Sequence, residues 1–97
     1  MSERDAALPD AIRLRLDVLE RALLLDYGYP FPDLRQALER LVDRPGEATV
    51  SVAPFYIEML VADLVRSAKE ISDEALLEEL DALCTNLELQ AARQDVR

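Results

Sequence analysis

Four segments of the chain space their apolar residues as helices do. Residues 9–27 start with Pro9, which suits a first helical turn, and end before Gly28, a residue type that often follows the last turn. Further along the chain, apolar side chains recur at intervals of three and four residues. The pattern therefore predicts four helices, over residues 9–27, 32–43, 54–69 and 73–90.

The first of these helices differs from the others because its apolar residues fall on two faces. One face runs from Ile12 to Leu23. The second face, about 120° away at about 100° per residue, is made of Leu14, Val18, Ala22 and Leu25. A helix with two apolar faces needs two neighbours. Either the other helices cover both faces, or the second face is left for another copy of the chain.

Residues 47–53 are the one ambiguous segment. Thr49, Val50 and Val52 favour a strand, but no other segment offers a partner strand, so the segment is predicted to be an extended connector. Four helices with short connections predict an all-α domain, either a compact four-helix bundle or an orthogonal helical array. Residues 1–97 form this single domain, with loose termini expected at 1–7 and 93–97.

Composition limits the chemistry that this domain can perform. The 97 residues contain 51% apolar side chains, which is enough for a folded core. The chain has no His, one Cys and two Gly, so it lacks the commonest general base, the commonest metal ligand and a glycine-rich phosphate loop. We therefore expect no catalytic residues, no metal site and no cofactor, and we predict that the protein is not an enzyme.

Charge indicates the kind of partner. Acids outnumber bases 20 to 11, and the net charge of −9 would repel nucleic-acid phosphates, so direct nucleic-acid binding is not expected. Between Lys69 and Arg93 lie seven acids and no base. Such a run is either a solvated helix face or a surface that docks on a basic protein. The residues predicted to contact that partner are Glu74, Glu78, Glu79 and Asp81.

Aromatic residues gather in the turn between the first two predicted helices. Tyr27, Tyr29 and Phe31 fall within a segment that also contains Pro30 and Pro32, although turns are usually polar. Either the aromatic rings cover one end of the core, or Tyr27 and Tyr29 are interface anchors, a role for which tyrosine is enriched.

The N-terminal residues and the choice of basic residues suggest where the protein is located. Residues 1–5 are mixed in charge and lead into no apolar run, so neither a secretory signal nor a membrane span is expected. Ten of the eleven bases are Arg, a usage that we associate with bacterial genomes rich in G and C. A bacterial, cytoplasmic protein is therefore predicted.

Together these features predict a small acidic binding module that docks on a basic protein and masks it, as immunity proteins, antitoxins and inhibitors do. A nucleic-acid mimic, which occupies a nucleic-acid-binding groove, is a variant of this hypothesis. The alternative is a homo-oligomeric structural subunit or assembly chaperone, such as a homodimer, that uses the second apolar face of the helix predicted at 9–27.

Overall fold

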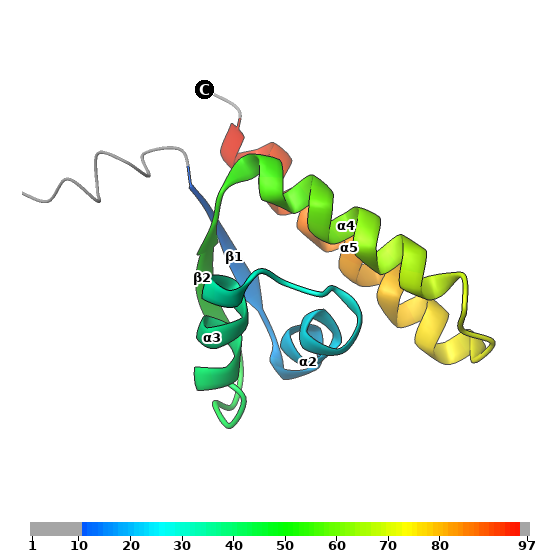
Figure 1. The fold of residues 1–97 in the computed structure, drawn as a ribbon. Coiled ribbons are helices and arrows are strands. Elements are labelled where there is room, and N and C mark those ends of the chain that lie inside the picture. Colours follow the sequence, from blue (N-terminus) through cyan, green and yellow to red (C-terminus); the bar gives the residue numbers. More distant parts are fainter. Residues whose placement is uncertain (1–10, 96–97) are drawn as a thin grey trace, which may run out of the picture.

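The structure is a computed structural model that describes residues 11–95. The described elements are, in order, β1 (Ile12–Leu16), α2 (Val18–Tyr27), α3 (Pro32–Arg40), β2 (Ala48–Val52), α4 (Pro54–Ala68) and α5 (Glu74–Asp95). Within residues 11–95 the chain has four helices together with a two-stranded antiparallel sheet, arranged as in Figure 1. The all-α prediction is therefore wrong. The expected loose N-terminus at 1–7, and the start of the first predicted helix at Pro9, lie outside the described residues.

The sheet replaces the first half of the helix predicted at 9–27. β1 reads Ile-Arg-Leu-Arg-Leu, and its side chains alternate between buried and exposed, which is the period of a strand. Its partner β2 lies within the segment predicted to be a connector, with Leu14 opposite Val50. The helical interpretation was wrong because Ile12 and Leu16, four residues apart, satisfy both periods.

Asp17 sets the boundary between β1 and α2. Its carboxylate accepts a hydrogen bond from the Glu20 backbone N–H at 2.8 Å, and the Glu20 carboxylate accepts one from the Asp17 N–H at 2.9 Å. This reciprocal pair is a capping box, which satisfies two donors that a helix start leaves free. The helix therefore begins at Val18, inside the segment predicted to be helical throughout.

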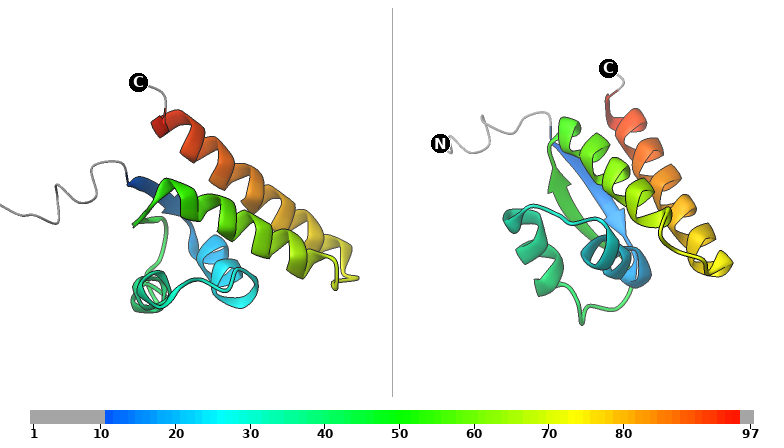
Figure 2. Two further views of the ribbon diagram at one scale, coloured as in Figure 1. Left: turned by 45° about the horizontal axis from the view of Figure 1, so that its top comes forward. Right: turned by 45° about the vertical axis from the view of Figure 1, so that its right-hand side comes forward.

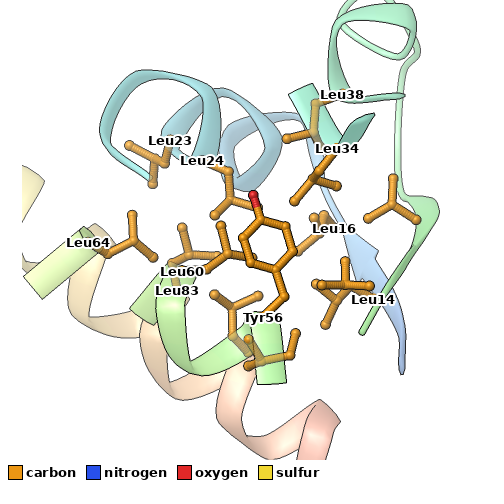
Figure 3. Packing of buried hydrophobic residues seen from close by; sticks show 14 of the residues in the cluster. Leu14, Leu16, Leu23, Leu24, Leu34, Leu38, Tyr56, Leu60, Leu64 and Leu83 are labelled. Carbon is orange, nitrogen blue, oxygen red and sulfur yellow. The ribbon is translucent and has the colours of Figure 1, made fainter. Parts of the chain in front are cut away.

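The helices enclose the core against one face of the sheet. α4 and α5 run antiparallel beside each other, with α5 along β1, while α3 lies near β2 (Figures 1 and 2). Buried apolar residues from both strands and all four helices meet between these elements; β2 contributes Val50 and Val52, and most of the others are leucines (Figure 3). The fully buried ones are Leu14, Leu16, Leu24, Leu38, Leu60, Leu64, Leu80, Leu83 and Leu87.

The three later helices were predicted with small errors at their ends. α3 ends at Arg40 rather than at 43, and α4 matches the predicted 54–69 closely. α5 starts one residue late because Asp73 is its cap, accepting hydrogen bonds from the backbone N–H groups of Ala75 and Leu76. α5 also extends beyond the predicted end at 90, so residues 93–95, expected in a loose tail, are helical.

Two glutamines explain why α5 continues. The Gln94 side-chain amide accepts from the Arg13 backbone N–H at 2.7 Å and donates to the Arg13 carbonyl at 2.8 Å. Gln90 does the same at Arg15, at 2.8 and 3.0 Å. Each amide therefore pairs with β1 as a neighbouring strand would, and the outer edge of the strand is covered.

Arg21 is a buried charge at the centre of the fold. Only 2% of its surface is exposed. Its guanidinium donates hydrogen bonds, at 2.5–3.3 Å, to four backbone carbonyls, those of Leu16, Leu41, Arg44 and Gly46. These carbonyls belong to the end of β1, the C-terminal end of α3 and the loop before β2. The cation at the end of α3 is also favoured by the helix dipole.

We expect the substitution Arg21→Met to lower the free energy of unfolding by about 3 kcal/mol or more, because buried carbonyls would lose their donors. Urea unfolding followed by circular dichroism measures this loss. Arg21→Lys keeps the charge but has fewer hydrogen-bond donors, so its free energy of unfolding should lie between those of the wild type and Arg21→Met. Arg35→Met, at an exposed site, should change stability by less than about 0.5 kcal/mol. A loss below about 1 kcal/mol for Arg21→Met would contradict the role given to this residue.

The double substitution Gln90→Ala/Gln94→Ala should free the outer edge of β1. We expect the backbone amides of Arg13 and Arg15 to exchange with solvent at least tenfold faster, because their acceptors are removed. The amides of Leu14 and Leu16, which face β2, should lose protection much less. Amide hydrogen exchange followed by NMR separates the two sets, and Gln36→Ala on α3 is the control. Equal acceleration at all four amides would instead indicate general loosening.

Candidate protein-binding surface

The acidic residues predicted to contact a partner lie on the first half of α5, and all four are exposed. No ion pair among residues 11–95 involves them. The pairs found there are Arg15 with Glu47, Arg35 with Glu39, and Arg66 with Asp63. The carboxylates of Glu74, Glu78, Glu79 and Asp81 therefore meet solvent without a neighbouring base in the described part of the chain.

Helical spacing divides these four residues. Glu74, Glu78 and Asp81 share one face of α5, and Glu88 continues that face two turns further on. Glu79 lies about 100° around the helix from Glu78 and points to a different side. The surface called the acidic face below consists of Glu74, Glu78, Asp81 and Glu88. Glu88 belongs to the base-free run between Lys69 and Arg93 but was not among the residues predicted to contact a partner.

An apolar groove begins where the acidic face ends. It has a volume of about 580 Å³ and lies between the start of α4 and the end of α5. Pro54, Phe55 and Ala92 contribute to its apolar lining, and Phe55 is 67% exposed. The charged side chains that line it are two glutamates, Glu58 and Glu88. This α4–α5 groove therefore combines apolar contact area with negative charge.

The negative charge of α5 also acts on the helix itself. Cys84 is half-buried between α5 and its neighbours. Burial raises the pKa of the Cys84 thiol, and the carboxylates of Glu88 and Asp81 raise it further. The thiol is therefore protonated at neutral pH and is a poor nucleophile. Two residues of the acidic face thus exert a field on the interior side of the same helix.

The predicted aromatic anchors differ in exposure. Tyr29 is 64% exposed and has a left-handed backbone conformation, with φ of 47°. Tyr27 is half-buried, and its carbonyl accepts a hydrogen bond from the Ser67 hydroxyl at 2.8 Å. A shallow hollow joins both tyrosines to Glu70, near the end of α4. Of the two, only Tyr29 offers most of its side chain to a partner.

Phe31 and Tyr56 cover the end of the core below this turn. Their rings stack with centroids 4.4 Å apart, and the Tyr56 hydroxyl accepts a hydrogen bond from the Phe31 backbone N–H. Burial raises the pKa of Tyr56 above its ordinary value, so the hydroxyl stays neutral. This pair fixes the turn that carries Tyr29.

The residues predicted to form an oligomer stripe do not form one surface. Leu14 is fully buried in β1, whereas Val18, at the start of α2, is 46% exposed. Ala22 and Leu25 are half-buried on α2. The stripe is interrupted because a strand, a cap and a helix replace the single helix on which it was placed.

The described residues form neither a metal site nor a membrane-spanning helix. Within residues 11–95, no group of three or more metal-ligating side chains is placed to hold an ion, and no helix there is long and apolar enough to cross a membrane. Comparisons with known protein families, curated proteins and solved structures found no match to this chain.

We expect Cys84 to react with iodoacetamide at a pH midpoint above that of an unperturbed thiol, because its pKa is raised. Glu88→Gln removes one of the causes and should lower the midpoint. Glu79→Gln makes the same charge change on another side of α5 and should leave it nearly unchanged. Alkylation rates from about pH 7 to about pH 10.5 measure the midpoints. Equal midpoints for the wild type and Glu88→Gln would contradict the proposed field.

Proposed function

We propose that this protein is a small non-catalytic binding module that docks on a basic protein and masks it, as immunity proteins, antitoxins and inhibitors do. The observation that carries this proposal is the acidic face of α5, whose carboxylates are exposed and have no ion-pair partner among residues 11–95. A bacterial cytoplasmic location is part of the same proposal, and the preference for Arg over Lys among the basic residues supports the bacterial origin.

Electrostatics supports a basic partner in two ways. A surface of one sign accelerates encounter with the opposite sign and rejects like-charged proteins. The negative charge of the acidic face is also not offset within α5, because that helix has no base before Arg93. At physiological ionic strength, screening acts beyond about 8 Å, so the attraction is strongest at close approach.

The α4–α5 groove supplies the apolar contact area that a charged surface alone does not provide. Charged contacts at the rim of an interface contribute mainly to association rate, whereas buried apolar contacts slow dissociation. Phe55 and Ala92 provide apolar surface, and Glu58 and Glu88 stand beside it. The partner segment that fits is one that alternates apolar side chains with Lys or Arg. At the other end of α4, Tyr29 offers a further contact.

A non-catalytic role agrees with the side chains on this surface. The carboxylates of the acidic face are exposed to solvent, and the Cys84 thiol is protonated at neutral pH. Mimicry of nucleic acid remains a form of the same proposal, because a basic groove built for phosphates would also accept a row of carboxylates. The homo-oligomer through Leu14, Val18, Ala22 and Leu25 is not retained, because Leu14 is buried.

To test the proposal, the protein is immobilised and used to capture a binding partner from an extract of the source cell. The partner is then identified and purified, and its binding to the protein is measured. We expect that partner to be basic and its affinity to fall as salt rises. The variant Asp81→Lys/Glu88→Lys should weaken binding at least tenfold. The control Glu39→Lys/Asp43→Lys makes the same change in net charge away from the acidic face and should weaken binding much less. Equal weakening by both variants, or an acidic partner, would count against the proposal.

A further inference from the structure

Within residues 11–95, no strand pairs with the outer edge of β2. In an antiparallel pair, the backbone groups of successive residues point alternately toward the partner strand and away from it. Arg13 and Arg15 direct theirs to the glutamine amides of α5, so Leu14 directs its own to β2. The same alternation directs the backbone groups of Thr49 and Ser51 outward. The hydrogen bonds found among residues 11–95 include none to these two backbones.

In the described part of the chain, this edge also lacks the features that usually protect an edge strand. Folded proteins cover such strands or place charges, proline or a bulge in them. Glutamine amides cover the edge of β1, but residues 48–57 form the longest uncharged stretch of the chain, ten residues in a sequence that is 32% charged. The pairing of β2 with β1 continues from Ala48 to Val52 without a bulge. Thr49, Val50 and Val52 have high strand propensity.

We infer that β2 is a strand-addition site for a second copy of this chain. Two copies related by a two-fold axis at Val50 would form a four-stranded antiparallel sheet in the order β1, β2, β2, β1. The inference concerns a surface outside the acidic face and does not rest on the proposed function.

The register of β2 is self-complementary about that axis. Thr49 of one copy lies opposite Ser51 of the other, and both residues direct their N–H and C=O groups outward. The strands can therefore exchange four hydrogen bonds. Residues opposite each other share a face, so Val50 meets Val50 on the core side, and Thr49 meets Ser51 on the solvent side. No side chain has to change face.

Charge favours a second copy at this edge and disfavours other approaches between copies. A chain with net charge −9 repels itself, and the neutral stretch 48–57 is where two copies meet the least like charge. With the axis at Val50, Glu47 lies opposite Ala53 and not opposite a second Glu47. The α5 helix lies on the other side of the sheet, beyond β1 (Figure 2), so the acidic faces of the two copies stay apart.

The inference is tested first on the wild-type protein over a range of concentrations. Sedimentation equilibrium should show a mass that rises from 10.9 kDa toward twice that value. In the same range, amide exchange by NMR should show concentration-dependent protection of Thr49 and Ser51. The amide of Val50, which faces β1, should be protected at all concentrations. A monomer up to about 1 mM, or protection of Thr49 and Ser51 only when a different protein is added, would overturn the inference.

Substitutions at Ser51 distinguish an effect on pairing at the outer edge of β2 from an effect on the fold. Ser51→Pro removes an N–H that β1 does not use, so we expect an unchanged circular dichroism spectrum and a dimer dissociation constant raised at least tenfold. Ser51→Ala keeps the N–H and should dimerise like the wild type. If the proline disturbs the fold, Thr49→Glu/Ser51→Glu places like charges opposite each other across the axis and should give the same weakening. Dimers as tight as the wild type in these variants would overturn the inference.

Discussion

The fold depends on the hydrogen bonds of the Arg21 guanidinium to backbone carbonyls. β1 and β2 are separated in sequence by two helices and a loop, so their pairing requires that the loop before β2 return to the end of β1. The guanidinium makes that connection, because Leu16 ends β1 and Gly46 precedes β2. Carbonyl dipoles solvate the charge in place of water or a carboxylate, and loss of the arginine would strand these acceptors.

The second constraint is the rotation of α5 about its axis. Asn86, Gln90 and Gln94 are spaced four residues apart and form one polar line along the helix. Asn86 donates to the Glu20 carboxylate at the start of α2, and the glutamines bind β1. With leucines filling the positions beside this line, the opposite side of α5 must face solvent. That side carries the acidic face, so the contacts that cover the strand edge also fix where the carboxylates point.

The spacing of apolar residues predicted the elements correctly where it fits only the period of a helix. The helices near 32–43, 54–69 and 73–90, and the exposure of Glu74, Glu78, Glu79 and Asp81, followed from it. It failed at β1, where Ile12 and Leu16 fit a helix and only Arg13 and Arg15 revealed alternation. Arg21 could not be found, because its acceptors are backbone groups far along the chain. The groove required the relative positions of α4 and α5, which no local pattern contains.

The acidic face of α5 and the outer edge of β2 are exposed because only one of the two strands has its outer edge covered by a helix. A two-stranded sheet is marginal in isolation and must be supported from the sides. α5 supports β1 by supplying amides to its edge, and it thereby turns its carboxylates outward. No helix does the same for β2, whose outward groups at Thr49 and Ser51 stay free within residues 11–95. In the two proposals, charge then distinguishes the partners: the acidic face would bind a basic protein, and the uncharged edge would pair with a strand of a second copy, whose own surroundings are acidic.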